Sequence, residues 1–333
     1  MPFEITTTEM HTGGEPVRIV ESGYPPLRGA TILDKRRDAR DHHDRLRRAL
    51  MLEPRGHADM YGVIPVEPDH PEADIAVLFM HNEGYSTMCG HAVLALARWA
   101  VDHGHVAGTA PVTEVAIQVP SGLVRAAVDF DGHRTGAARF LSVPSFVAAA
   151  DVTVEVPGHG AVTLDVAYGG AFYALVPAAA LGLALGDAPI GDIVAAAWAV
   201  TRTVAEQVPL HHPDDPDLAF LYGTIVTDGR DASSEQPTRN VCVFADRQVD
   251  RSPTGSGVQA RIAAMRSRGQ VELGQVRRFE SLTGAVFTGR ALSETFAGEV
   301  PAVVVEVGGT AHYTGTATFT LEQDDGLEPF LVR

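Results

Sequence analysis

The segment STMCGHAVLALARWAVDHG, residues 86–104, indicates a helix that is apolar on nearly all of its faces. Within it, the run 92–101 is interrupted only by Arg98, and Gly104 is typical of the residue that follows the end of a helix. A helix of this kind belongs inside a core, with other elements packed around it. The sequence therefore predicts a buried central helix whose first residues follow Cys89.

Cys89 would lie at the positive end of the dipole of this helix. Backbone N–H groups in a first helical turn have no partner inside the helix, so they can bind an anion such as a carboxylate. Gly90 would let that anion come close. The same field favours thiolate over thiol, which would make Cys89 a base or a nucleophile near neutral pH. The alternative is that Cys89 is only a small buried hydrophobic residue, as many free cysteines are.

A second segment repeats this layout with a hydroxyl in place of the thiol. In RSPTGSGVQARIAAM, residues 251–265, Thr254 precedes a glycine-rich start to a helical pattern that ends at Gly269. Two shorter echoes keep the same order along the chain, namely GGEPVRIV at 13–20 with GGAFYALV at 169–176, and SGLV at 121–124 with TGAV at 283–286. These echoes favour a duplicated architecture in which two buried helices present their N-termini across an interdomain cleft and hold a substrate carboxylate from two sides.

Composition places limits on the class of protein. The chain has 333 residues, 45% hydrophobic and 20% charged, which suits a globular protein with two cores. A net charge of -16 argues against nucleic acid and anionic membrane surfaces as partners. No stretch approaches the roughly 20 apolar residues of a membrane span, and MPFEITTTEM lacks a signal pattern, so a cytoplasmic location is expected. Two cysteines make no disulfide framework, and Cys242 in NVCVF is predicted to lie in a buried strand.

Cofactor chemistry finds little support in the sequence. The only lysine, Lys35, lies in the charged run DKRRDARDHHDRLRR, residues 34–48, which is predicted to form the solvated face of a helix. No lysine is then left for a Schiff base with pyridoxal phosphate. No Walker motif is found, no GxGxxG follows a strand, and the histidine pairs 42–43 and 211–212 lack a zinc spacing. We therefore expect neither a cofactor nor a metal site.

Two further polar residues lie near the helix starts. Residues two apart on a helix point to different sides, so we expect Cys89 to act as a base without direct pairing to His91, whose ring would face another part of the ligand. Asp250 precedes Thr254 by one short loop. Its carboxylate either reaches the mouth of the pocket or only caps the loop or pairs with Arg251.

Four motifs resemble the proline racemase family, and together they cover nearly the whole chain: MLEPRGHADMYG at 51–62, NEGYSTMCGH at 82–91, YGGAFYALV at 168–176 and TRNVCVFADRQVDRSPTGSGVQAR at 238–261. The resemblance implies the α/β fold of diaminopimelate epimerase, with two pseudo-symmetric domains that each wrap a curved, mostly antiparallel sheet around a central helix. It places one lobe at residues 1–145 with a C-terminal return at 311–333, the other at 146–310, and the active site in the cleft between them. It also implies catalysis without a cofactor and a homodimer.

The resemblance further implies roles for individual residues. Racemases and epimerases of the family place one cysteine on each side of the substrate Cα, and here those positions hold Cys89 and Thr254. Backbone amides would hold the substrate carboxylate, namely those of Gly90, His91, Gly255 and Ser256. The side chains of His91 and Asp250 would hold the ring nitrogen. The aromatic rings of Tyr61 and Phe244 would cover the pyrrolidine ring. For either aromatic residue alone, plain core packing is the alternative.

The threonine changes the expected reaction. Racemisation by two bases needs one group to remove the Cα proton and another to protonate the opposite face, and a hydroxyl is too weak an acid and base for that near pH 7. A carbanion formed beside Cys89 must then react in another way. If the next ring carbon carries a hydroxyl, that reaction is β-elimination of water. In trans-3-hydroxy-L-proline that hydroxyl lies on the same ring face as the Cα hydrogen. Family members with this Cys/Thr pairing also resemble dehydratases, with Δ1-pyrroline-2-carboxylate as the product.

Other interpretations of the sequence stay open. The chain is alternatively a proline racemase or hydroxyproline 2-epimerase in which another group replaces the second base. It is also conceivable as a catalytically silent binder of imino acids, although a binder has no need of the thiolate at Cys89. Thr254 either hydrogen-bonds the substrate hydroxyl or fills the space of a thiol. The acid for the leaving hydroxyl is undecided between Cys89, His91, Thr254 and water.

Overall fold

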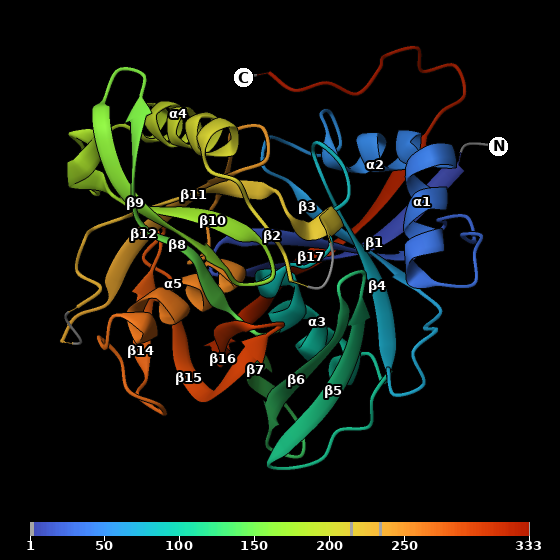
Figure 1. The fold of residues 1–333 in the computed structure, drawn as a ribbon. Coiled ribbons are helices and arrows are strands. Elements are labelled where there is room, and N and C mark those ends of the chain that lie inside the picture. Colours follow the sequence, from blue (N-terminus) through green and yellow to red (C-terminus); the bar gives the residue numbers. More distant parts are fainter. Residues whose placement is uncertain (1–2, 214–215, 233–234, 333) are drawn as a thin grey trace. The chain divides into compact units, whose positions relative to one another are not determined.

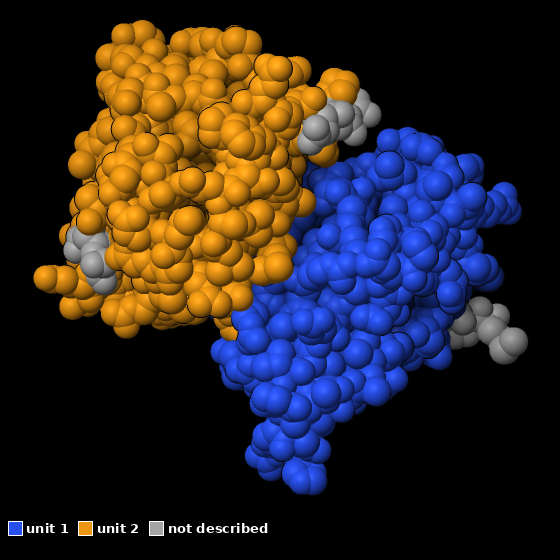
Figure 2. All heavy atoms as spheres, turned by 60° about the horizontal axis from the view of Figure 1, so that its bottom comes forward, with its two compact units in different colours: residues 1–140, 310–333 blue, residues 141–309 orange. Residues whose placement is uncertain are grey.

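The computed structural model describes residues 3–213, 216–232 and 235–332. The chain divides into two compact units, the first made of Met1–Phe140 with Thr310–Arg333 and the second of Leu141–Gly309 (Figures 1 and 2). In each unit the strands pair mostly antiparallel and one buried helix packs against several of them. The expected fold class, with two pseudo-symmetric α/β domains, is confirmed.

The strands of the first unit pair in the order β17 (Ala311–Leu321), β1 (Phe3–Thr12), β2 (Glu15–Ser22), β3 (Tyr61–Val66), β4 (Ile75–His81), β5 (Val112–Val119), β6 (Gly122–Phe130) and β7 (Thr135–Leu141). Neighbours are antiparallel except at the steps from β2 to β3 and from β4 to β5, which are parallel. Helices α1 (Ile32–His42) and α2 (Asp44–Met51) connect β2 to β3. The buried helix α3 (Gly90–Asp102) contacts β1, β2, β5, β6 and β17.

The strands of the second unit pair in the order β8 (Phe146–Val156), β9 (Gly160–Tyr168), β10 (Phe172–Pro177), β11 (Leu221–Thr227), β12 (Thr238–Phe244), β14 (Arg277–Glu280), β15 (Val286–Ala297) and β16 (Val300–Gly309). The parallel steps here are β10 to β11 and β12 to β14. A short strand β13 (Gln248–Asp250) forms a hairpin with β12. The unit also contains α4 (Ile190–Gln207), the 3-10 turns η1 (Ala178–Leu181) and η2 (Pro216–Leu218), and the buried helix α5 (Gly255–Ser267).

The two units follow one pattern of strand pairing. In both, three antiparallel strands lead by a parallel step to an antiparallel pair, and a second parallel step leads to three more antiparallel strands. The glycine pairs of the sequence echo lie at equivalent turns, Gly13 and Gly14 between β1 and β2, and Gly169 and Gly170 between β9 and β10. The sequence echoes therefore mark corresponding parts of a duplicated fold.

The two central helices form where the sequence predicts them. In α3 every residue from Gly90 to Ala97 is buried, and Arg98 reaches outward so that its Nη1 donates to the Ala311 carbonyl at 2.6 Å. Beyond the helix ends, Gly104 has φ +76° and Gly269 has φ +68°, the left-handed backbone that favours glycine after a helix. Cys242 is fully buried in β12, as predicted.

The charged run 34–48 differs from the expected solvated helix face. It spans two helices, with His43 between them, because α1 ends at His42 and α2 begins at Asp44. Asp38 and Arg47 within this run are buried. The Arg47 Nη1 donates to the His81 carbonyl at 2.8 Å, so part of the charge serves to hold α2 against the end of β4. No helix in the described part of the chain has the length and apolar character to cross a bilayer.

Candidate active site

Cys89 precedes the first residue of α3 and is 6% exposed. Its backbone is extended, with φ -150° and ψ 108°, and its carbonyl accepts the first helical hydrogen bond, from the amide of Val93, at 3.0 Å. Gly90 and His91 open the helix, where backbone N–H groups point out of the helix end. The thiol is therefore placed beside the amides and the dipole that the sequence analysis assigned to anion binding.

Cys89 and His91 are in contact, which corrects the expectation that they point apart. The Cys89 Sγ lies 3.2 Å from Nδ1 and 3.7 Å from Nε2 of the His91 ring. The helix geometry behind that expectation applies to two residues inside a helix, but Cys89 lies outside it with an extended backbone. Its side chain is therefore free of the helical spacing and turns onto the face of the imidazole.

The His91 ring packs against an aromatic stack made of Tyr61 and His81. The Tyr61 ring meets the His91 ring edge-on, with centroids 4.9 Å apart, and stacks on the His81 ring at 6.0 Å. The Tyr61 hydroxyl contacts the Ser86 Oγ, and the Thr12 Oγ1 donates to the His91 carbonyl at 2.9 Å. The first turn of α3 is thus held to β1 and β3, with Tyr61 beside His91.

His81 is a neutral member of this stack. Burial, together with the positive charges of Arg47 and Arg36, lowers the pKa of His81 from its ordinary value of 6.5 to about 3. The amide of Glu83 donates to the His81 Nδ1 at 3.3 Å, so that nitrogen acts as an acceptor. A neutral ring packs against Tyr61 without placing an uncompensated charge in the core.

This low pKa predicts a contribution of His81 to the pH dependence of stability. Between its two pKa values, histidine binds a proton in the unfolded chain and none in the folded protein, so the free energy of unfolding falls as the pH drops from 6.5 towards 3. We expect the His81→Gln variant to reduce the slope of unfolding free energy against pH by up to about 1.4 kcal/mol per pH unit. Urea unfolding at a series of pH values measures the slope. The matched change at the exposed His133 is the control for removing a histidine as such, and a His81→Gln profile parallel to that of the wild type would contradict the assignment.

Thr254 precedes α5 as Cys89 precedes α3, but in a strained conformation. It has φ +66° and ψ 97°, a left-handed backbone that a β-branched residue rarely adopts and that costs on the order of 1–3 kcal/mol. Thr254 is 4% exposed. Its Oγ1 is buried and has no hydrogen-bond partner among the described residues. Strain combined with an unsatisfied buried hydroxyl is typical of a functional position.

The residues around Thr254 form a compact turn. The Asp250 carboxylate accepts a hydrogen bond from the Ser252 amide at 2.7 Å, and the Ser252 Oγ accepts one from the Thr254 amide at 3.1 Å. Asp250 is buried and ends strand β13. It therefore caps the turn, as one of the two sequence interpretations held, and this brings its carboxylate next to the start of α5.

Two tyrosines contact residues of this unit that were predicted to bind substrate. The Ser256 Oγ lies 2.7 Å from the hydroxyl of Tyr173, and burial raises the pKa of Tyr173 well above its ordinary value, so the phenol stays protonated. The Phe244 ring stacks on Tyr222 with centroids 5.4 Å apart.

Gly169 allows α5 to approach the turn between β9 and β10 closely, because a Cβ at that position would lie 2.2 Å from the Ser256 carbonyl oxygen.

The structure gathers the predicted residues into two groups, one in each unit. Cys89, Gly90, His91 and Tyr61 lie together in the first; Asp250, Thr254, Gly255 and Ser256 lie together in the second, with Phe244 at the end of the paired strand β12.

Sequence reasoning missed the supporting residues His81, Ser86 and Tyr173. Tyr173 lies within the motif YGGAFYALV, which was a usable signal, whereas nothing in the sequence indicated the stack at His81. In the described part of the chain, no group of three His, Cys, Asp or Glu side chains is placed to hold a metal ion.

Comparison with known proteins relates the whole chain to one family. Residues 7–330 match the family model described as Proline racemase. A trans-L-3-hydroxyproline dehydratase of Xenopus tropicalis is 57% identical over 97% of this chain and 94% of its own length. A 3-hydroxyproline 2-epimerase of Burkholderia multivorans is 47% identical over 99% of this chain and 98% of its own length. The crystal structure of a probable proline racemase from Agrobacterium radiobacter, with bound carbonate, superposes with a TM-score of 0.89 at 28% identity, over 97% of this chain and 94% of that one.

Proposed function

Because the chain belongs to the proline racemase family, we propose that it removes water from trans-3-hydroxy-L-proline without a cofactor and yields Δ1-pyrroline-2-carboxylate. The observation that carries this proposal is the pair of residues before the two equivalent helices, a cysteine before α3 and a threonine before α5. The similarity to a protein named trans-L-3-hydroxyproline dehydratase supports the same reaction.

Cys89 acts as the base in the proposed reaction. Its thiolate takes the Cα proton and becomes a thiol, and the electron pair of the Cα–H bond forms a double bond to C3 as the C3–O bond breaks. The departing oxygen takes the proton that the Cys89 thiol now carries and leaves as water, which restores the thiolate. The resulting enamine tautomerises to the imine. The position of Cys89 beside the first turn of α3 supports this role, because the dipole of that helix favours thiolate over thiol.

The substrate carboxylate is held by backbone amides in this proposal. Gly90 and His91 open α3, and Gly255 and Ser256 open α5. Proton removal spreads negative charge from Cα into the carboxylate, so N–H groups and helix dipoles aimed at it stabilise the transition state more than the bound substrate. The side chains of His91 and Asp250 hold the ring nitrogen.

Tyr61 and Phe244 cover the pyrrolidine ring in the proposed complex. Both are fixed by aromatic neighbours, Tyr61 against His91 and Phe244 against Tyr222, so they present rigid apolar surfaces to the ligand. Rigid walls of this kind reduce the entropy lost on binding.

Thr254 lies on the ring face opposite Cys89 in this proposal, and its hydroxyl binds a polar group of the substrate there. A buried hydroxyl without a partner costs about 1–3 kcal/mol, and a hydrogen bond to the ligand would recover that cost. The unpartnered and buried Oγ1 of Thr254 supports this role over that of a mere space filler.

A substrate comparison in deuterated water tests the function. We expect imine to form from trans-3-hydroxy-L-proline and not from L-proline, with NMR spectroscopy following both substrates. Imine formation confined to the 3-hydroxy compound supports the dehydratase. Rapid appearance of D-proline with deuterium at Cα would contradict it.

The second candidate function is 2-epimerisation of 3-hydroxyproline. It is favoured by the relative from Burkholderia multivorans, which is 47% identical and named for that activity. The same experiment distinguishes the two, because epimerisation keeps the hydroxyl and yields the cis-3-hydroxy-D isomer in place of the imine.

The proposed partner of the protein is its small imino acid substrate. We also propose that the protein is a cytoplasmic homodimer, as the family resemblance implies. Light scattering on the purified protein tests the dimer, with a mass of twice the chain's 35.4 kDa as the expected result.

A further inference from the structure

The strained turn at Thr254 has a tether that reaches it from strand β12. The Asn240 Nδ2 donates to the carbonyl of Pro253 at 3.3 Å, one residue before Thr254. A left-handed backbone at a β-branched residue persists only where surrounding contacts enforce it. This hydrogen bond joins the turn to strand β12, and the Thr283 Oγ1 also donates to the Arg251 carbonyl at 3.4 Å.

The orientation of Asn240 is fixed by its second partner. Its Oδ1 accepts from the Arg261 Nη1 at 2.8 Å, and a guanidinium only donates, so the oxygen must face Arg261. The amide nitrogen is thereby turned towards Pro253. Asn240 is 2% exposed, so water cannot readily replace either partner.

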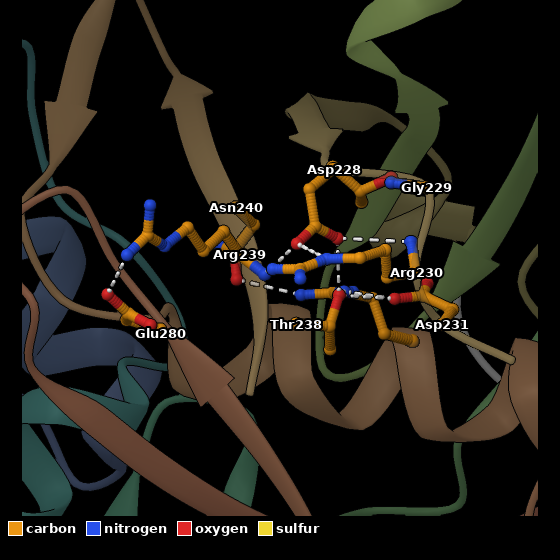
Figure 3. A network of polar contacts seen from close by, with 10 residues as sticks. Asp228, Gly229, Arg230, Asp231, Thr238, Arg239, Asn240 and Glu280 are labelled. Atoms are coloured by element: carbon orange, nitrogen blue, oxygen red, sulfur yellow. Dashed lines mark hydrogen bonds and ion pairs between the residues drawn. The ribbon is translucent and has the colours of Figure 1, made fainter. Parts of the chain in front are cut away.

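Arg261 is itself held by several groups. Its side chain is fully buried in α5, its Nη2 contacts the Asp231 carboxylate and donates to the Thr238 Oγ1 at 2.7 Å, and its guanidinium lies 4.8 Å from the centroid of the Phe279 ring. Figure 3 shows Asn240, Thr238 and Asp231 within this network of polar contacts. Because Arg261 belongs to α5, Asn240 connects the body of that helix to the turn that precedes it.

We propose that Asn240 is a positioning residue that holds Thr254 in its left-handed conformation and thereby aims the Thr254 hydroxyl and the first amides of α5 at the ligand. The inference rests on the proposed function for what those groups bind. Its structural part, the enforcement of the backbone at Thr254, does not depend on catalysis.

The Asn240→Asp variant separates positioning from packing. Aspartate keeps an oxygen towards Arg261 but replaces the donor to Pro253 with a second oxygen, which repels the carbonyl. We expect the dissociation constant of pyrrole-2-carboxylate, a planar mimic of the carbanion, to rise at least tenfold by calorimetry.

The control is Asp231→Asn, which is isosteric and weakens the other side of the same Arg261 network without touching Pro253. It should lower the melting temperature and leave the dissociation constant within about twofold. Equal losses of affinity in both variants, or wild-type affinity in Asn240→Asp, would overturn the proposal.

A stability measurement tests the same inference without any ligand. Glycine adopts a left-handed backbone at no steric cost, so Thr254→Gly removes the need for the tether. Asn240→Asp should lower the melting temperature at most half as much in the Thr254→Gly background as in the wild type. If Asn240→Asp alone fails to fold, the double variant should regain a cooperative unfolding transition. Strictly additive changes, or no recovery, would overturn the proposal.

Failure of the wild type to bind pyrrole-2-carboxylate would instead count against the proposed function. The comparison of melting temperatures would still decide the role of Asn240.

Discussion

Replacement of Cys89 with serine is expected to abolish water loss from trans-3-hydroxy-L-proline while the fold stays intact. A hydroxyl at this position is a far weaker base than a thiolate, and a positioned acid–base group contributes about 10²–10⁴-fold to rate. Turnover should fall by at least that range. The side chains are nearly isosteric, and the Cys89 thiol makes no capping hydrogen bond to α3, so the melting temperature should change little.

The chain offers a matched control for this experiment. Cys242 is the other cysteine and is fully buried in β12, where it pairs with Asp250 of β13 without being one of the proposed site residues. Cys242→Ser should keep most of the turnover and lower stability, because it buries a hydroxyl in an apolar strand. Near-normal turnover in Cys89→Ser would refute the assignment of the base, whereas equal losses in both serine variants would point to damaged structure.

Replacement of Thr254 with cysteine is expected to create 2-epimerase activity. The carbanion formed beside Cys89 could then receive a proton from a second thiol on the opposite face, as two-base racemisation requires. We expect cis-3-hydroxy-D-proline to appear from trans-3-hydroxy-L-proline at a rate at least about 10²-fold above the wild-type background. Cysteine is not β-branched, so it should tolerate the backbone at φ +66° at least as well as threonine does.

Thr254→Ser is the control for this gain of activity. Serine keeps a hydroxyl and lacks a thiol, so it should retain dehydration and give no epimer. Chiral chromatography measures the products, and deuterium incorporation at Cα in deuterated water confirms protonation by solvent-derived protons. A Thr254→Cys variant that forms no epimer, or a serine variant that forms as much, would contradict the two-face argument.

The sequence predicted the two central helices and their duplicated setting because apolar patterning dominates both. A run such as 92–101 is buried in any compact arrangement, and Gly104 and Gly269 mark the helix ends through their left-handed backbone. The motifs around Cys89 and Thr254 similarly brought the site residues to the N-termini of α3 and α5.

The remaining features depend on contacts between residues distant in sequence. The Cys89–His91 contact was predicted wrongly because the extended backbone at Cys89 follows from the path of the loop before α3 rather than from helical spacing. The stack at His81 requires strands β3 and β4 to be paired before it can be recognised. Arg261 in the predicted central helix was a visible signal, since a buried guanidinium needs partners, but the identity of those partners required the fold.

The repeated pattern of strand pairing has a consequence for how such proteins diverge. Each half has its own hydrophobic interior and its own residue ahead of the central helix, so a substitution at one of these two places leaves the opposite half untouched. Under the proposed mechanism, one codon ahead of a central helix therefore decides between elimination and stereochemical inversion, while the residues of the other half stay the same.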